Sequence, residues 1–283
     1  MRQIFIILII LLNLGHTSYN GLLFPKNNIE LITNSSDYFI FKNIILSNQY
    51  HDNFSSNYIT FPNSVSSNSL IYNIQLSSLK LTPSIQIINY GEIDDSETGY
   101  KFRSEDYILS NQLHKNITNN FLSTFELKYL YSKIDNFHSS ILATKLNFIY
   151  NLNFLVFEIF LDNYGTILTT YTSAIEKLPE NYGYSLMYKP KNLNLLFLYK
   201  NEFFQNHMDF NLSVELMLND NSIFMGISSI GQDLYYGNFE DDFFTGTSLG
   251  LKTKYKNFDF MLGYQNLGIL GSSTSLTILK SLN

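Results

Sequence analysis

The sequence predicts an all-β fold, a transmembrane antiparallel β-barrel of about 14 strands. In many segments apolar and polar residues alternate with a period of two, as in a strand whose two faces meet different surroundings. The connections between these segments are alternately short and long, which is typical of outer-membrane barrels. Aromatic residues make up 16% of the 283 residues, with 24 Phe, 21 Tyr and no Trp. Barrels place such rings at both lipid interfaces, so Tyr and Phe alone would form the two bands.

Residues 1–20 are predicted to be a secretory signal peptide. Arg2 supplies a positive start, residues 4–12 form an unbroken apolar run, and small residues follow before a cleavage point near residues 18–20. The run is too short to span a bilayer, which makes a membrane anchor the weaker alternative. No later stretch approaches the length of a spanning helix, so we expect the exported chain to enter the bacterial outer membrane as a barrel.

Residues 21–53 show no sustained period. Apolar positions such as Phe39 and Phe41 are interrupted by Asn and Ser residues. We therefore expect an irregular N-terminal segment that plugs the barrel, with one additional strand as the alternative. The barrel itself is predicted to run from residue 54 to residue 283.

The alternation is clearest between residues 123 and 150. One face of the first segment carries Phe125, Leu127, Tyr129 and Tyr131, and the same face of the second carries Leu142, Leu146, Phe148 and Tyr150. A membrane barrel turns such a face to lipid, whereas a soluble sandwich buries it. Alternation alone leaves the sandwich open. The sandwich would bury many Tyr hydroxyls, however, and it does not predict the rhythm of the connections.

Asn, Asp, Gly and Pro dominate the connections, as turn geometry requires. Short ones are predicted at residues 80–83, 114–120, 151–153, 190–192, 219–222 and 256–257. Long ones are predicted at residues 62–69, 91–105, 133–138, 162–181, 201–206, 229–246 and 266–272. The count of 14 strands places both ends of the barrel on the short-turn side, as in single-chain bacterial barrels.

The charged residues on the predicted polar faces are expected to fill or wet the lumen. These lumenal candidates are Glu126, Lys128, Lys145, Asp209, Glu215, Lys252 and Lys254. The five His are isolated, Cys is absent, and no nucleophile or phosphate-loop motif occurs, so we predict no enzyme activity, no metal site and no cofactor. Acidic residues at 92–97 and 240–242 are interpreted as solvated loops, with Ca²⁺ binding as an alternative. A net charge of −6 argues against a nucleic-acid partner.

Several short runs together point to a family. They are residues 88–93 (INYGEI), 97–99 (ETG), 105–107 (EDY), 127–132 (LKYLYS), 139–143 (SSILA), 162–165 (DNYG) and 178–179 (LP). These runs are similar to the PorV/PorQ family of bacterial outer-membrane proteins, and the C-terminal part, residues 243–283, most resembles PorQ. The chain departs from the family in having Asn43-Ile44-Ile45 where an Asn-Pro-Ala motif is usual. The resemblance therefore indicates a divergent member.

The resemblance implies a barrel related to FadL-type transporters and a role in type IX secretion, as a scaffold or anchor of the secretion and cell-surface attachment machinery. Its partners would be other proteins of that machinery, bound through the external loops. Exposed aromatic residues favour interfaces. The partner-binding candidates are Tyr164, Tyr171, Tyr235, Tyr236, Phe239 and Phe243. Packing of the loops over the barrel mouth is the simpler explanation for these rings.

Two further hypotheses remain open. FadL-like transport of hydrophobic small molecules predicts an apolar pocket in the lumen and a gap in the wall. An adhesive surface sandwich requires a soluble mature chain.

Overall fold

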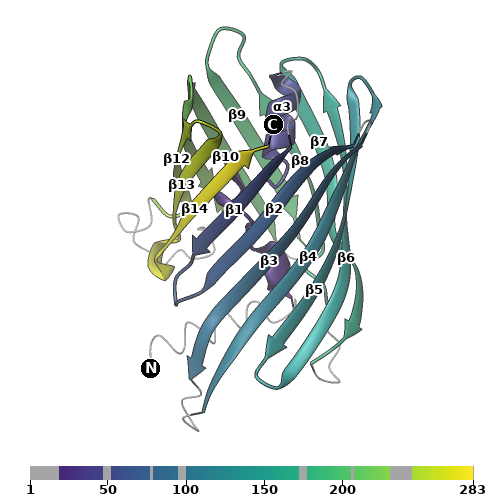
Figure 1. Ribbon diagram of the computed structural model, residues 1–283, viewed down its shortest axis with the longest axis vertical. Helices are drawn as coiled ribbons and strands as arrows, with labels where there is room; N and C mark the ends of the chain where they lie inside the picture. The colour runs from purple at the N-terminus through teal and green to yellow at the C-terminus, as the bar shows by residue number, and fades with distance from the viewer. Residues whose placement is uncertain are drawn as a thin grey trace.

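Fourteen antiparallel strands close into a single barrel in the computed structural model (Figure 1), in which β1 pairs with β14 and every other neighbour is consecutive in sequence. The structure describes residues 19–46, 52–76, 79–94, 100–171, 177–204, 207–229 and 244–282. The predicted all-β class, the barrel and the number of strands are confirmed. A sandwich is wrong for this chain because the sheet closes on itself.

The bounds of the strands and helices are as follows. The strands are β1 Asn53–Thr60, β2 Ser66–Leu76, β3 Leu79–Asp94, β4 Lys101–Thr118, β5 Phe121–Ile134, β6 Phe137–Asn151, β7 Leu155–Thr169, β8 Asn181–Tyr188, β9 Leu195–Phe203, β10 Met208–Leu218, β11 Asn221–Ser228, β12 Thr247–Tyr255, β13 Phe258–Asn266 and β14 Ser272–Ser281. The helices are η1 Asn20–Leu23, α2 Asn28–Thr33, α3 Tyr38–Ile45 and η3 Gly268–Leu270. Among the described residues, no helix is long and apolar enough to cross a bilayer.

Residues that alternate along a strand lie in turn on the inner and the outer face of the barrel wall. Along β5, Glu126 and Lys128 are buried toward the lumen while Phe125 and Leu127 are exposed on the outer face. Apolar side chains exposed in this way around the barrel form a lipid-facing surface. The polar inner face then needs partners within the lumen, because burying unpaired charge is costly.

Aromatic rings gather on the outer face near both ends of the barrel. The end that carries the long connections has the ring pairs Tyr107–Tyr131, Tyr182–Phe203 and Tyr184–Tyr199. The end that carries the short turns has Phe121–Phe148, Phe154–Tyr188 and Tyr188–Phe197. These are the positions of the two interfacial bands of a membrane barrel, built without Trp.

Several predicted connections are wrong because the strands extend further than their polar sequences suggest. Residues 80–83 lie within β3, residues 162–169 lie within β7, and β5 and β6 leave only residues 135–136 as their turn. In Figure 1, β3 to β7 reach below the other strands. Backbone pairing needs no apolar side chain, so a strand that leaves the lipid continues through a polar sequence.

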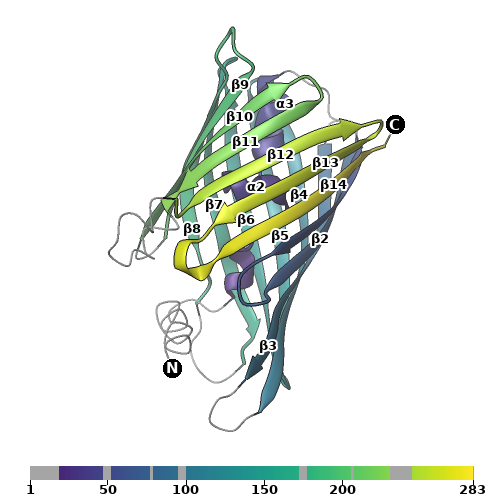
Figure 2. The same ribbon diagram turned by 90° about the vertical axis from the view of Figure 1, so that its left-hand side faces the viewer.

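The N-terminal segment is helical rather than irregular, and it adds no strand to the wall. Its residues 19–46, called here the lumenal segment, contain η1, α2 and α3, which lie inside the ring of strands (Figure 2). Asn27 caps α2 by accepting a hydrogen bond from the Glu30 N–H at 3.0 Å, and Asn34 ends the helix in a left-handed conformation. Helices of six and eight residues are too short to show a clear period, which explains why the pattern missed them.

Candidate functional site

In the described part of the chain, three ion pairs with buried wall residues join the lumenal segment to the inner wall of the barrel. Lys26 Nζ lies 2.5 Å from Glu126 Oε1 on β5, and Lys42 Nζ lies 2.5 Å from Glu215 Oε1 on β10. The third pair has the opposite polarity, with Asp37 Oδ2 lying 2.5 Å from Lys145 Nζ on β6. The segment is therefore attached to different sides of the wall by charges that neither part satisfies alone.

Asp37 is the most heavily bonded of these groups. It lies at the start of α3, is 1% exposed, and accepts hydrogen bonds from Asn147 Nδ2 at 2.8 Å and Gln112 Nε2 at 2.9 Å as well as from Lys145. Burial by itself would raise the pKa of the Asp37 carboxyl, but the Lys145 ammonium overcomes that effect and holds the pKa below its usual range. Asp37 is therefore ionised inside the barrel.

The predicted lumenal residues divide into two groups. Glu126, Lys145 and Glu215 contact the lumenal segment. The others face wall or loop residues: Lys128 lies 2.6 Å from Asp162, Asp209 lies 3.3 Å from His207, Lys252 lies 2.7 Å from Asp259, and Lys254 is exposed near the short-turn end of β12. Lys254 therefore contributes nothing to the filling of the barrel.

Sequence reasoning missed the partners that the segment supplies, Lys26, Asp37 and Lys42. The available signal was the presence of isolated charges in a stretch that is otherwise apolar or amidic. Each of these charges has the opposite sign to the buried wall residue that it contacts.

The predicted partner-binding residues mostly lie outside the described part of the chain. Tyr235, Tyr236, Phe239 and Phe243 are in that group, as are residues 240–242. Tyr164 is a correction, because it belongs to β7, where it pairs with Thr144, and not to a loop. Tyr171 is also corrected, because its ring stacks on Tyr19 with centroids 6.3 Å apart and its hydroxyl donates to Ser132. For Tyr171, these contacts agree with packing of the loop over the barrel mouth.

No group of acidic, His or Cys residues within the described ranges has an arrangement that could hold a metal ion. Of the first acidic cluster, the described Glu92 pairs with Lys101 at 2.8 Å on the surface.

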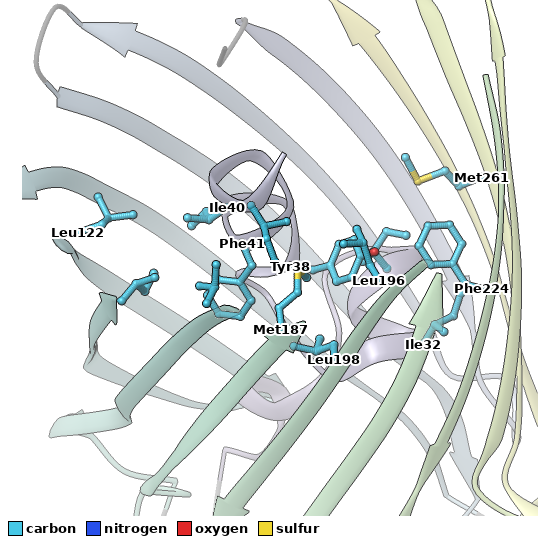
Figure 3. Close-up of a cluster of buried hydrophobic side chains, with 14 residues drawn as sticks. Ile32, Tyr38, Ile40, Phe41, Leu122, Met187, Leu196, Leu198, Phe224 and Met261 are labelled. Atoms are coloured by element: carbon cyan, nitrogen blue, oxygen red, sulfur yellow. The ribbon is translucent and has the colours of Figure 1, made fainter. Parts of the chain in front are cut away.

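Apolar side chains of α3 attach the segment near the short-turn end. Tyr38 and Phe41 pack against wall residues that include Met187, Leu198 and Phe224 (Figure 3). The Tyr38 hydroxyl also donates to Glu215, so one ring makes both an apolar and a polar contact. Packing and charge therefore hold α3 in the same place.

A second apolar cluster lies near the long-loop end of the lumen. Ile108, Leu130 and Ile141 are direct neighbours on the inner faces of β4, β5 and β6. The lumenal segment covers this row with Tyr19, together with the partly buried Leu22 and Phe24. An apolar inner row occupied by part of the chain itself is a candidate site for an apolar solute.

A cavity of about 240 Å³ lies between the lumenal segment and the wall formed by β1 to β5 and β12 to β14. Most of the residues that line it are polar or charged, among them Lys26, Lys80, His114, Glu126, Lys252 and Asp259. A polar lining of this kind suits water rather than a hydrocarbon.

Helix α2 packs so closely against the wall that a residue larger than glycine at two wall positions would force its side chains to move. A side-chain carbon at Gly250 would lie 2.2 Å from Ile32 Cδ1, and one at Gly263 would lie 2.6 Å from Asn28 Nδ2. These two glycines face each other in the β12–β13 pair. The wall is therefore shaped to fit this helix.

We expect Gly250→Val to displace α2, because a branched side chain would occupy the space of Ile32. Hydrogen exchange at the amides of residues 29–33 should rise at least about tenfold, as expected when a contact worth about 1.4 kcal/mol or more is lost. Leu249→Val, on the outer face of the same strand, is the control and should leave this exchange unchanged. Unaltered exchange in Gly250→Val would contradict the observed fit.

Comparison with known proteins shows likeness in structure only. No protein-family model and no curated protein sequence matches the chain. The CymD monoaromatic hydrocarbon channel superposes with a TM-score of 0.57 at 10% identity, covering 95% of this chain and 98% of that one. The P. putida toluene transporter TodX gives 0.55 at 8% identity, covering 91% and 94%, and a TodX deletion mutant gives 0.56 at 9%, covering 90% and 99%. The chain therefore has the FadL-like fold of outer-membrane barrel channels.

Proposed function

We propose that the protein is an outer-membrane channel for small hydrophobic molecules, closed in this conformation by its lumenal segment, and that it reaches the membrane after cleavage of its signal peptide. The observation that carries the proposal is the apolar inner row of Ile108, Leu130 and Ile141. An inner wall that only had to hold water or ions would need no such row. The fold shared with two hydrocarbon channels supports the same function.

A solute that enters from the long-loop end meets the apolar row first. Tyr19, Leu22 and Phe24 occupy that row and would have to yield to the solute. Beyond the row, Glu126 and Lys145 present charge to the lumen, and their ion pairs with the segment close the path. Opening therefore requires movement of the lumenal segment rather than of the wall.

Uptake of radiolabelled toluene by cells that express the protein tests this function. We expect Leu130→Asp to lower the uptake at least about tenfold, since a carboxylate on the apolar row costs several kcal/mol in contact with a hydrocarbon. Leu130→Met is the matched control and should keep most of the uptake. Heat-modifiable migration on gels verifies that both variants are folded. Equal toluene uptake by cells with and without the protein would contradict the proposal.

A second candidate function is the scaffold role in type IX secretion that the family resemblance implies. The extension of β3 to β6 beyond the long-loop aromatic band supports it, because a rigid projection suits protein contacts. So does the cavity, because most of the residues that line it are polar or charged. Mass spectrometry of material that co-purifies with the tagged protein from outer membranes tests this role. Recovery of secretion components would support it, and a barrel free of such partners would exclude it.

A further inference from the structure

We infer that the amino group freed by removal of the signal peptide is bound inside the barrel by the carboxylate of Asp106. The site goes beyond the channel function and would serve either candidate function. It would make the processed end of the chain part of the closed structure.

Asp106 is a buried carboxylate that accepts hydrogen bonds on both oxygens but has no cation in contact with it among the described residues. It faces the lumen from β4, is 3% exposed, and accepts hydrogen bonds from the Tyr90 hydroxyl at 2.8 Å and from the Ser132 hydroxyl. In the part of the chain that the structure describes, no Lys, Arg or His lies within ion-pair distance of it. Asp37, Glu126 and Glu215, by contrast, each have a lysine at 2.5 Å. An ionised carboxylate in such a place needs a positive partner.

The position of Asp106 distinguishes it from Glu158, which among the described residues is also a buried carboxylate without a cation in contact. Glu158, on β7, accepts a hydrogen bond from Ser185 and lies toward the short-turn end. Asp106 lies at the opposite end, where the lumenal segment begins. A side-chain carbon at Gly21 would be 2.1 Å from Asp106 Oδ2, so the backbone of Gly21 lies directly against the carboxylate.

Tyr19 is held beside the same row of wall residues. Its hydroxyl lies 2.5 Å from Ser139 Oγ. Across the sheet, Ser139 pairs with Ser132, and Ser132 pairs with Asp106. Tyr19 therefore contacts Ser139, and Gly21, two residues later, contacts the Asp106 carboxylate.

The expected cleavage point brings an amino group to this carboxylate. Cleavage after residue 18, 19 or 20 makes Tyr19, Asn20 or Gly21 the first residue. Residues 20–23 form the 3-10 helix η1 and Tyr19 is its N-cap, so the new ammonium would lie on Gly21 or on one of the two residues before it, beside the backbone that contacts Asp106. Before cleavage the same nitrogen is a neutral amide. Only the processed chain can form the ion pair, and processing is thereby coupled to docking of the lumenal segment.

The test measures the reactivity of the α-amino group in the folded, detergent-extracted protein. The protein is treated with an acetylating reagent, and the N-terminal peptide is quantified by mass spectrometry. We expect the mature chain to begin at residue 19, 20 or 21 and its α-amine to react at least about tenfold more slowly when folded than after denaturation, as expected for a buried ion pair. Asp106→Asn should abolish the protection.

Two comparisons separate the ion pair from general packing. Glu126→Gln breaks a different contact of the segment and should leave the α-amine protected. In protein refolded with its signal peptide still attached, where the same nitrogen is a neutral amide, Asp106→Asn should leave the melting temperature unchanged, whereas in the processed protein the same substitution should lower it by several degrees. A mature chain that begins elsewhere, or an α-amine that reacts equally fast in the folded and denatured states, would overturn the inference.

Discussion

Deletion of residues 19–46 is expected to open the barrel, raising ion conductance in planar bilayers at least about tenfold over the full chain, as in wide barrels with an empty lumen. The physical reason is that this segment, and not wall side chains, fills the interior. Its removal exposes Glu126, Lys145 and Glu215 to water, which favours a hydrated pore. Single-channel recording of the refolded deletion variant measures the effect.

A disulfide lock supplies the matched control, since the chain contains no cysteine of its own. A carbon added at Gly263 would lie 3.0 Å from Asn28 Cγ, so Gly263→Cys with Asn28→Cys places two Cβ atoms within about 4.5 Å, inside disulfide range. We expect the oxidised lock to abolish toluene uptake and the reduced form to restore it. A folded deletion variant that stays at baseline conductance would show that another element closes the barrel.

Replacement of Asp37 by Ala should have the largest effect of any single substitution, lowering the free energy of unfolding by about 3–5 kcal/mol. The change leaves Lys145 buried without its counterion and also removes the acceptor used by Gln112 and Asn147. Urea titration in lipid vesicles measures the loss. Adding Lys145→Met to Asp37→Ala should recover part of it, because the uncompensated charge is then gone.

The surface pair Lys101–Glu92 is the control for Asp37→Ala. Its side chains are 60% and 45% exposed, and Glu92→Gln should leave stability within experimental error. If Asp37→Ala also left the free energy of unfolding unchanged, the buried ion pair would not be holding the segment.

The same aspartate predicts how the stability of the closed barrel depends on pH. The folded-state pKa of Asp37 is lowered, so its contribution is complete above the unfolded pKa of about 3.9 and is lost as pH falls below that value toward the folded pKa. Wild-type stability should therefore fall below about pH 4. Asp37→Ala should remove this part of the pH dependence.

The ends of the strands show where sequence reasoning stops. Residues 162–169 read as a loop because Asp162, Asn163 and Gly165 are turn residues, yet they form part of β7. Pairing with β6 supplies the backbone hydrogen bonds there, with a register shift that accommodates the irregular residues. Polarity marks where lipid ends, whereas the length of the neighbouring strand decides where pairing ends.

Local pattern was enough to predict the barrel, its 14 strands and the orientation of most side chains. Glu126 and Lys145 were assigned to the lumen correctly because alternation is a property of one strand and needs no knowledge of its neighbours. What those charges contact depended on the folded chain as a whole. Asp37 and Lys145 are 108 residues apart, and Lys42 and Glu215 are 173 apart. Closure of the sheet around the N-terminal helices brings these groups together. A local sequence pattern contains no information about contacts between residues so far apart in the chain.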